Sequence, residues 1–152
     1  MESINGGCLC GAVRYTVTAK PIVTRACWCK LCQSLASGNA TINLAFPANA
    51  ITITGELRDY SCIADDGNKM HRRFCPDCGV HLFSDAEERP TIIVVRAGTL
   101  DDTEQVKIEG IIWTSSAPSW AYLDPNMPHF EKQPPAPLLS PLLAPQVNDD
   151  KP

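Results

Sequence analysis

The chain has 152 residues, enough for one domain with an ordinary hydrophobic core, and a formal net charge of −4. This weakly acidic balance argues against a nucleic-acid-binding protein, because such proteins normally present a basic face to the phosphates. A membrane protein is not expected either, since no apolar run approaches the roughly 20 residues that a spanning helix requires.

Short β-strands are expected in the first half of the chain. Residues 13–18 alternate apolar and polar side chains, as in a strand with one buried face, and residues 42–46 repeat the pattern. Residues 51–54 are β-branched throughout, which also favours a strand. A further strand at 21–25 runs into a cysteine cluster, and a turn or two of helix is expected after it, around 33–36.

The second half continues in the same way. Strands at 70–74 and 80–83 flank a Cys-x-x-Cys-Gly turn, which predicts a hairpin like that of a zinc ribbon, with a positive φ at Gly79. The continuous apolar run 91–97 is expected to form a central strand that is buried on both faces. No segment keeps a sustained helical periodicity, so the sequence predicts a mainly β protein with little helix.

Composition changes near the end of the chain, where nine of the 13 prolines lie from Pro118 onward. We therefore expect a single β domain over residues 1–132 and an extended, proline-rich tail over 133–152. The tail carries leucines at 138, 139, 142 and 143, which are apolar for a free segment. They favour docking on the domain or on a second copy of the chain, as in a homo-oligomer.

The first residues, Met1 to Asn5, have neither the basic nor the apolar segment of a secretory signal peptide, which favours a cytoplasmic location. Thiols stay reduced in that compartment. Cysteines at Cys-x-x-Cys spacing in such a protein indicate metal binding rather than disulfides.

Seven of the eight cysteines fall into three tight clusters: Cys8 and Cys10; Cys27, Cys29 and Cys32; and Cys75 and Cys78. A structural zinc ion is closed by four ligands, whereas a catalytic zinc ion keeps one position open. Seven thiolates do not complete two closed sites, but they fit one closed site of four and one open site of three. The sequence therefore predicts two zinc ions with different roles.

The order and spacing of these clusters resemble the glutathione-dependent formaldehyde-activating family, also called the Gfa or centromere-protein-V-like family. Its motif Gly-Cys-x-Cys-Gly-x-Val-Arg-Tyr is matched by residues 7–15, and its motif Phe-Cys-x-x-Cys-Gly-x-x-Leu by residues 74–82. Residues 98–101 look like its Gly-x-Leu-Asp turn, and residues 113–120 resemble its aromatic C-terminal stretch. The resemblance covers residues 5–131.

This resemblance implies a β-tent, a folded antiparallel sheet pinned by the structural zinc ion. It places that ion on Cys8, Cys10, Cys75 and Cys78, and a second ion on Cys27, Cys29 and Cys32. Because three ligands from one short segment chelate less strongly than four, we expect the second ion to be the more labile. It further implies that the three-cysteine site is catalytic. In the family's reaction, glutathione thiolate attacks formaldehyde to give S-hydroxymethylglutathione.

The second cluster departs from the family pattern Cys-His-Cys-x-x-Cys-Arg at two positions, where Trp28 replaces histidine and Gln33 replaces arginine. Trp28, Lys30 and Gln33 remain the expected contacts of the thiol co-substrate. Lys30 is expected to offset the negative site or attract a carboxylate, and Trp28 to wall the pocket. Because tryptophan and glutamine carry no positive charge, we expect a more apolar pocket with weak affinity for glutathione.

Five residues outside the clusters receive interpretations of their own. Arg72 and Arg73 are expected to form an exposed charge pair, with anion binding as the alternative. Trp113 and Trp120 are expected to pack in the core or at its rim, and one of them has a pocket wall as its alternative role. His81 follows the third cluster and is a candidate for contact with it.

Two functions fit these residues. The preferred one is a zinc-dependent carbon–sulfur lyase that acts on a glutathione–aldehyde adduct or a related thiol adduct. Zinc with three thiolates carries a net charge of −1, which suits a soft sulfur nucleophile better than water. The alternative is a non-catalytic, zinc-stabilised binding or thiol-carrier module. The expected partners are a small thiol and an aldehyde, without nucleic acid or membrane.

Overall fold

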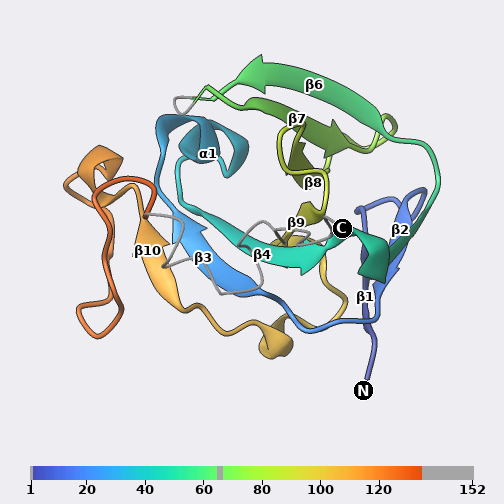
Figure 1. Ribbon diagram of the computed structural model, residues 1–152, viewed down its shortest axis with the longest axis horizontal. Helices are drawn as coiled ribbons and strands as arrows, with labels where there is room; N and C mark the ends of the chain where they lie inside the picture. Colours follow the sequence, from blue (N-terminus) through green and yellow to red (C-terminus); the bar gives the residue numbers. More distant parts are fainter. Residues whose placement is uncertain (1, 65–66, 135–152) are drawn as a thin grey trace, which may run out of the picture.

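The structure is a computed structural model that describes residues 2–64 and 67–134. Within these ranges the chain forms ten β-strands, one α-helix and four short 3₁₀ turns (Figure 1). The mainly β class predicted from the sequence is confirmed, as is the presence of cysteine clusters that can hold zinc.

The strands form two sheets. The smaller sheet is antiparallel, in the order β1–β2–β5, with β1 at Ile4–Gly7, β2 at Arg14–Val17 and β5 at Ile51–Thr54. The larger sheet has the order β10–β3–β4–β9–β8–β7–β6. Its strands are β3 (Val23–Cys27), β4 (Thr41–Pro47), β6 (Arg58–Ile63), β7 (Lys69–Phe74), β8 (His81–Ala86), β9 (Ile92–Arg96) and β10 (Gly110–Ile112). The helix α1 (Lys30–Leu35) follows β3.

The main core lies between the smaller sheet and one face of the larger sheet. Val17, Phe46 and Val95 are fully buried in it, because every second residue of their strands faces inward. The Tyr15 ring meets the Phe83 ring edge-on, with 5.2 Å between the ring centroids. These contacts join the two sheets through apolar packing.

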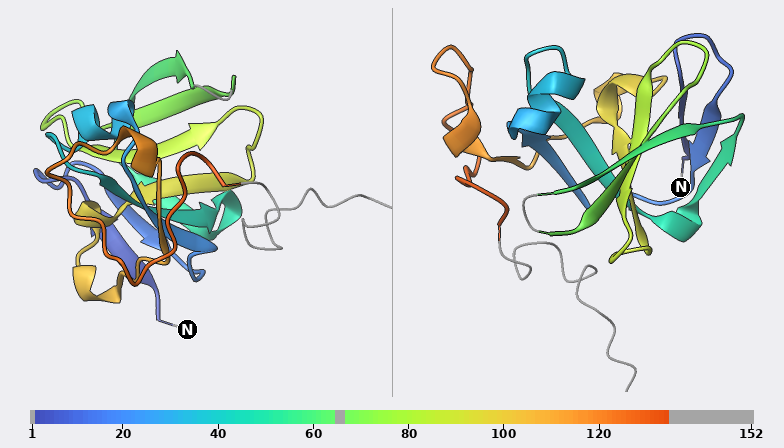
Figure 2. Two further views of the ribbon diagram at one scale, coloured as in Figure 1. Left: turned by 90° about the vertical axis from the view of Figure 1, so that its left-hand side faces the viewer. Right: turned by 90° about the horizontal axis from the view of Figure 1, so that it is seen from above.

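The opposite face of the larger sheet is concave. In Figure 1 the sheet curls so that the β6–β7 hairpin at its edge lies across from β3 and β4. The helix α1 lies on the other side of the molecule from β1 and β2, in Figure 1 and in the right-hand view of Figure 2. The two ends of the molecule are therefore built from different parts of the chain.

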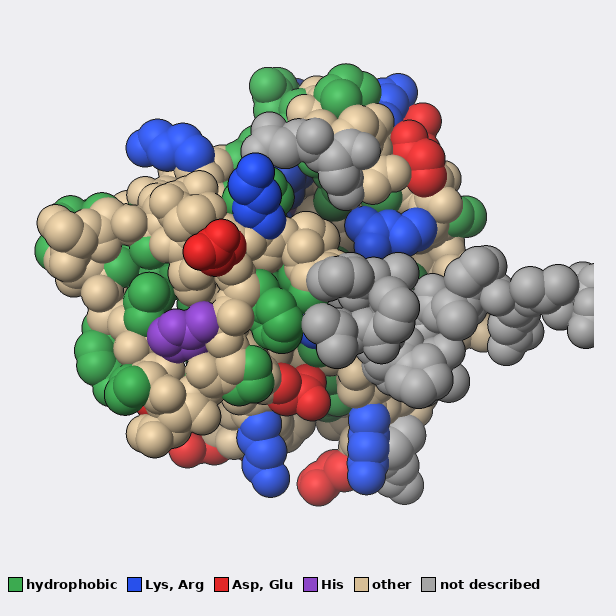
Figure 3. All heavy atoms as spheres, turned by 60° about the vertical axis from the view of Figure 1, so that its left-hand side comes forward, with side chains coloured by type: hydrophobic (Ala, Val, Ile, Leu, Met, Phe, Trp, Pro, Cys, Tyr) green, Lys and Arg blue, Asp and Glu red, His purple; other side chains and the backbone are tan. Residues whose placement is uncertain are grey.

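Charged side chains of both signs are interspersed with apolar ones on the face drawn in Figure 3. In the part of the chain that the structure describes, no helix is long and apolar enough to cross a membrane. The predicted tail over 133–152 lies outside the described residues except for Gln133 and Pro134. The domain boundary at 132 and the docking of the tail leucines therefore stay predictions.

Candidate functional site

Four cysteines from distant parts of the sequence meet where the two sheets join. Cys8 and Cys10 lie between β1 and β2, and Cys75 and Cys78 lie in the turn between β7 and β8. Their sulfurs all lie within 4.8 Å of one another, with Cys8–Cys10 at 3.6 Å and Cys10–Cys75 at 3.7 Å. Sulfurs at the corners of a regular zinc tetrahedron, each about 2.3 Å from the metal, stand about 3.8 Å apart. The donor set and its spacing therefore fit a closed zinc site.

The local backbone conformation and backbone hydrogen bonds hold the sulfurs of this four-cysteine cluster in place. Gly79 has the predicted positive φ, 75°, and its N–H donates to the Cys75 carbonyl at 2.9 Å. The Val13 N–H donates to the Cys8 sulfur at 3.2 Å. Backbone hydrogen bonds from Val80 and Cys10 lower the pKa of the Cys78 thiol to about 6, so this sulfur is ready to bind metal at neutral pH.

The second cluster contains the other three predicted ligands. Cys27 ends β3, Cys29 caps the N-terminus of α1, and Cys32 lies in its first turn. The three sulfurs lie within 4.8 Å of one another, and the Cys32 N–H donates to the Cys29 sulfur at 3.4 Å. Such a set fits a three-ligand zinc site with one open position.

Hydrogen bonds among the three thiols shift their pKa values in opposite directions. Contacts with Cys29 and Cys32 raise the pKa of the Cys27 thiol, whereas contacts with Cys27 and Cys29 lower that of Cys32. The hydroxyl of Thr41 and the charge of Arg96 lower the pKa of Cys32 further. The cluster therefore already favours a thiolate at Cys32 before any metal binds.

The three cysteines open into a cavity of about 750 Å³ on the concave face of the larger sheet. Strands β3, β4, β6, β7, β8 and β9, together with α1, contribute its walls. The volume lies within the range of ordinary small-molecule sites, about 300–1,000 Å³. Trp113 and Ile112 line the cavity, and both also pack in the apolar cluster that surrounds the cysteines.

Four arginines line the same cavity: Arg25, Arg72 and Arg96 are each about nine-tenths buried, and Arg89 is exposed. Arg96 donates from Nε to His81 Nδ1 at 3.1 Å and from Nη2 to Ser84 Oγ at 3.1 Å, and Nη1 donates to Asn43. None of these partners is charged at neutral pH. Ser84 and Asn43 have neutral side chains, and burial together with the Arg96 and Arg72 charges lowers the pKa of His81 to about 4. Burial lowers the pKa of Arg96 to about 10, so it remains a cation at neutral pH.

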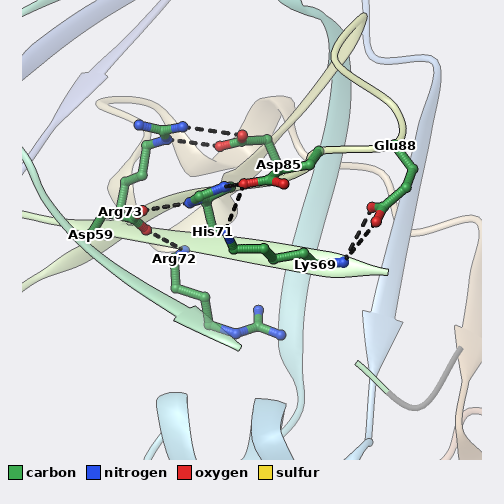
Figure 4. Close-up of polar contacts among 8 residues, drawn as sticks. Asp59, Lys69, His71, Arg72, Arg73, Asp85 and Glu88 are labelled. Atoms are coloured by element: carbon green, nitrogen blue, oxygen red, sulfur yellow. Dashed lines mark hydrogen bonds and ion pairs between the residues drawn. The ribbon is translucent and has the colours of Figure 1, made fainter. Parts of the chain in front are cut away.

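Arg72 differs from the exposed residue expected from the sequence. Its backbone N–H donates to Asp59 at 3.1 Å, but its Nε is buried and has no hydrogen-bond partner among residues 2–64 and 67–134. Figure 4 shows its guanidinium pointing away from the ion pairs formed by its neighbours. Arg73 instead pairs with Asp85 at 2.7 Å. The expectation of an exposed Arg72–Arg73 pair is therefore wrong, because alternate residues of β7 face opposite sides.

Of the three predicted substrate contacts, Lys30 lies at the cavity and is exposed. Trp28 and Gln33 are not among the residues that line it. The Trp28 ring is buried in a separate apolar cluster and meets Trp120 edge-on at 6.2 Å. Gln33 donates to the carbonyls of Trp28 and Ser116, at 2.8 and 2.9 Å. Trp113 and Tyr60, rather than Trp28, are the aromatic residues that line the cavity, and Gln33 holds the backbone beside the cysteines by hydrogen bonds.

Two of the three buried arginines at the cavity, Arg25 and Arg96, were not singled out in the sequence analysis, and Arg72 appeared there only with anion binding as an alternative role. One signal was present, since Arg25 lies two residues before Cys27 on the same strand face. Arg96 ends an apolar run, where a charge has to be accommodated by polar neighbours.

Comparisons with known proteins agree with the resemblance seen in the motifs. The family model described as "Glutathione-dependent formaldehyde-activating enzyme" matches residues 3–116. A Halomonas elongata protein named "Putative glutathione-dependent formaldehyde-activating enzyme" is 26% identical over 127 residues, covering 80% of this chain and 81% of the relative.

A crystal structure of a Rhodobacter sphaeroides protein matches with a TM-score of 0.52 and 18% identity, over 68% of this chain and 96% of that one. This likeness shows a shared fold. Because the family model spans most of the sequence, including all seven clustered cysteines, the chain belongs to the glutathione-dependent formaldehyde-activating enzyme family.

Proposed function

We propose that the protein is a zinc-dependent carbon–sulfur lyase acting on a glutathione–aldehyde adduct of the S-hydroxymethylglutathione type. The observation that carries this proposal is the opening of the three-cysteine cluster into a cavity with three buried arginines. Soft sulfur ligands and buried cations in one cavity suit a substrate that is both a thiol and an anion.

The donor set of Cys27, Cys29 and Cys32 would hold a zinc ion, which supplies a positive centre that keeps an incoming thiol in its thiolate form. The three thiolate ligands contribute three negative charges, so the zinc ion and its ligands together carry a net negative charge. Arg96 lies close enough to all three sulfurs to interact with their charge. Its fixed cation offsets this excess without any movement of the chain.

The arginines also explain how an anionic tripeptide would be held. A buried cation with unused N–H donors gains more from a carboxylate than an exposed one, because no water competes for it. Arg72 has such a donor at Nε. The expectation of a more apolar pocket rested on Trp28 and Gln33, which do not line the cavity, whereas Arg25, Arg72 and Arg96 bring positive charge to it from other strands.

The reaction balances without a redox partner. In the direction of synthesis, the thiolate sulfur attacks the aldehyde carbon and a carbon–sulfur bond forms, while the carbonyl oxygen takes up a proton. Lysis reverses these steps. The side chains of Trp113 and Ile112 would limit access of water to the reacting sulfur.

The test is the exchange rate between ¹³C-formaldehyde, glutathione and their adduct, measured by NMR with reduced, zinc-loaded protein. The wild type should accelerate exchange, and Cys32→Ser should lose the acceleration. Cys62→Ser is the matched control, since Cys62 is a half-buried residue of β6 outside both clusters. Glutathione binding without faster exchange in the wild type would instead indicate a non-catalytic binding module.

A further inference from the structure

Strand register orders the side chains that face the cavity. Along β3, Cys27, Arg25 and Val23 take alternate positions and all line the cavity. The pairing of β3 with β4 and of β4 with β9 sets Arg25 beside Asn43 and Arg96. The same pairing sets Val23 beside Ala45 and Val94. Three rows of side chains therefore follow one another across the strands on the concave face. The first carries thiols, the second cations and the third apolar side chains, and successive rows are about 7 Å apart.

The apolar row belongs to a larger apolar end of the cavity. Val23, Ala45 and Val94 are extended by Met70 on β7, Ala86 on β8 and Ile92 on β9. Two of these six residues are alanines, which leave room that larger side chains would fill. The exposed Arg89, between Ala86 and Ile92 in the sequence, also lines the cavity, but the six apolar side chains themselves offer no hydrogen-bond partners to the polar groups of a tripeptide.

We infer that the cavity accepts adducts whose aldehyde carries a hydrocarbon chain of several carbons. This inference rests on the proposed function, because the thiol end must hold the sulfur of the adduct. Val23 lies four residues from Cys27, about 13 Å along an extended strand. The single carbon of formaldehyde stays at the thiol end, whereas a longer alkyl group extends past the arginines and buries itself against Val94 and Ala45.

Stable thioethers test this inference without any turnover. The affinities of S-methyl-, S-butyl- and S-octylglutathione for the zinc-loaded full chain are measured by calorimetry. Each methylene group that becomes buried should tighten binding by up to about four-fold. The gain should level off once the alkyl chain reaches the end of the cavity. An affinity that does not change along the series would overturn the inference.

Variants then locate the alkyl chain. Val94→Phe should fill the apolar end and bring the octyl-to-methyl affinity ratio close to one, and Ala45→Leu serves the same purpose if Val94→Phe does not fold. Val106→Phe is the matched control, because Val106 does not line the cavity, and the ratio should stay at its wild-type value. If both cavity variants keep the wild-type ratio, the alkyl chain binds elsewhere and the inference is wrong.

The exchange assay separates this inference from the proposed function. If the formaldehyde adduct is turned over but affinity does not change with alkyl length, the proposed lyase activity is supported and the inference about long-chain aldehydes is wrong. If affinity rises with alkyl length but no adduct is turned over, binding at the apolar end is supported and the proposed lyase activity is wrong. Exchange of the octanal adduct with a higher kcat/KM than that of the formaldehyde adduct would support both.

Discussion

At the scale of single residues, cysteines and arginines differ in how well the sequence reveals them. The ligands of a three-cysteine knuckle lie within six residues, so their spacing alone indicates a metal site. Arg25, Arg72 and Arg96 come from three strands and meet only through sheet register and curvature. The same limit explains Trp28, whose position between two cysteines did not reveal that its ring points into another apolar cluster.

Arg72→Met tests the role of a buried cation. Hydrogen bonds to charged groups contribute about 1.5–3 kcal/mol, so kcat/KM for the glutathione adduct should fall by about 10- to 100-fold. The ligand-free melting temperature should stay the same or rise, because the substitution removes a buried Nε without a hydrogen-bond partner among the described residues.

Arg72→Lys is the matched control, since it keeps the charge but not the guanidinium fork. It should fall between the wild type and Arg72→Met in kcat/KM. A lower melting temperature with unchanged kcat/KM for Arg72→Met would contradict a binding role and make Arg72 a structural residue.

At the scale of elements, most strands could be predicted because alternation and β-branching are local properties. The predicted strand 51–54 is β5 residue for residue, and the apolar run 91–97 contains β9 in the middle of the larger sheet. The three-residue strand β10 was not expected, since three residues carry no readable period. Its parallel pairing with β3 depends on contacts remote in the sequence.

The β6–β7 hairpin carries an ion-pair cluster on the side opposite to Arg72 (Figure 4). His71 pairs with Asp59 through Nδ1 and with Glu87 through Nε2, the latter at 2.9 Å. The other charged residues around it are Lys69, Arg73, Asp85 and Glu88. The cluster ties β6 and β7 to the end of β8, and these three strands form one wall of the cavity.

This cluster predicts a pH dependence of stability. Hydrogen bonds with Asp59 and Glu87 raise the pKa of His71 above its ordinary value of about 6.5. The stabilisation is then fully present below about pH 6.5 and is lost as the pH rises through the raised value. With saturating zinc, the wild type should lose more melting temperature between pH 6 and pH 8 than His71→Asn. Parallel pH profiles of the two proteins would refute this role for His71.

At the scale of the whole molecule, the four-cysteine cluster connects the smaller sheet to the larger one. The motifs identified its members and the family fold, but local patterns do not determine how the two sheets pack. That arrangement depends on contacts such as Tyr15 with Phe83, and Tyr15 with Thr99 at 2.9 Å, which join residues far apart in the sequence.

Cys75→Ser should prevent folding. Structural zinc in small domains contributes on the order of 10 kcal/mol, comparable to the whole stability of a domain. The variant should be insoluble or lack a cooperative melting transition, whereas Cys32→Ser should stay folded with a melting temperature close to that of the wild type. Soluble, zinc-free Cys75→Ser with an unchanged melting temperature would show that this cluster is not structural.

The central claim is that one cysteine cluster supports the fold while the other carries the chemistry. Gradual chelation of the zinc-loaded protein, with zinc content, adduct exchange and melting temperature followed together, tests it most directly. Exchange activity should disappear as the first zinc ion per chain is lost from the three-cysteine site, with the fold intact, and unfolding should accompany loss of the second. Simultaneous loss of both ions with unfolding, or activity that persists with one zinc ion per chain, would contradict the account.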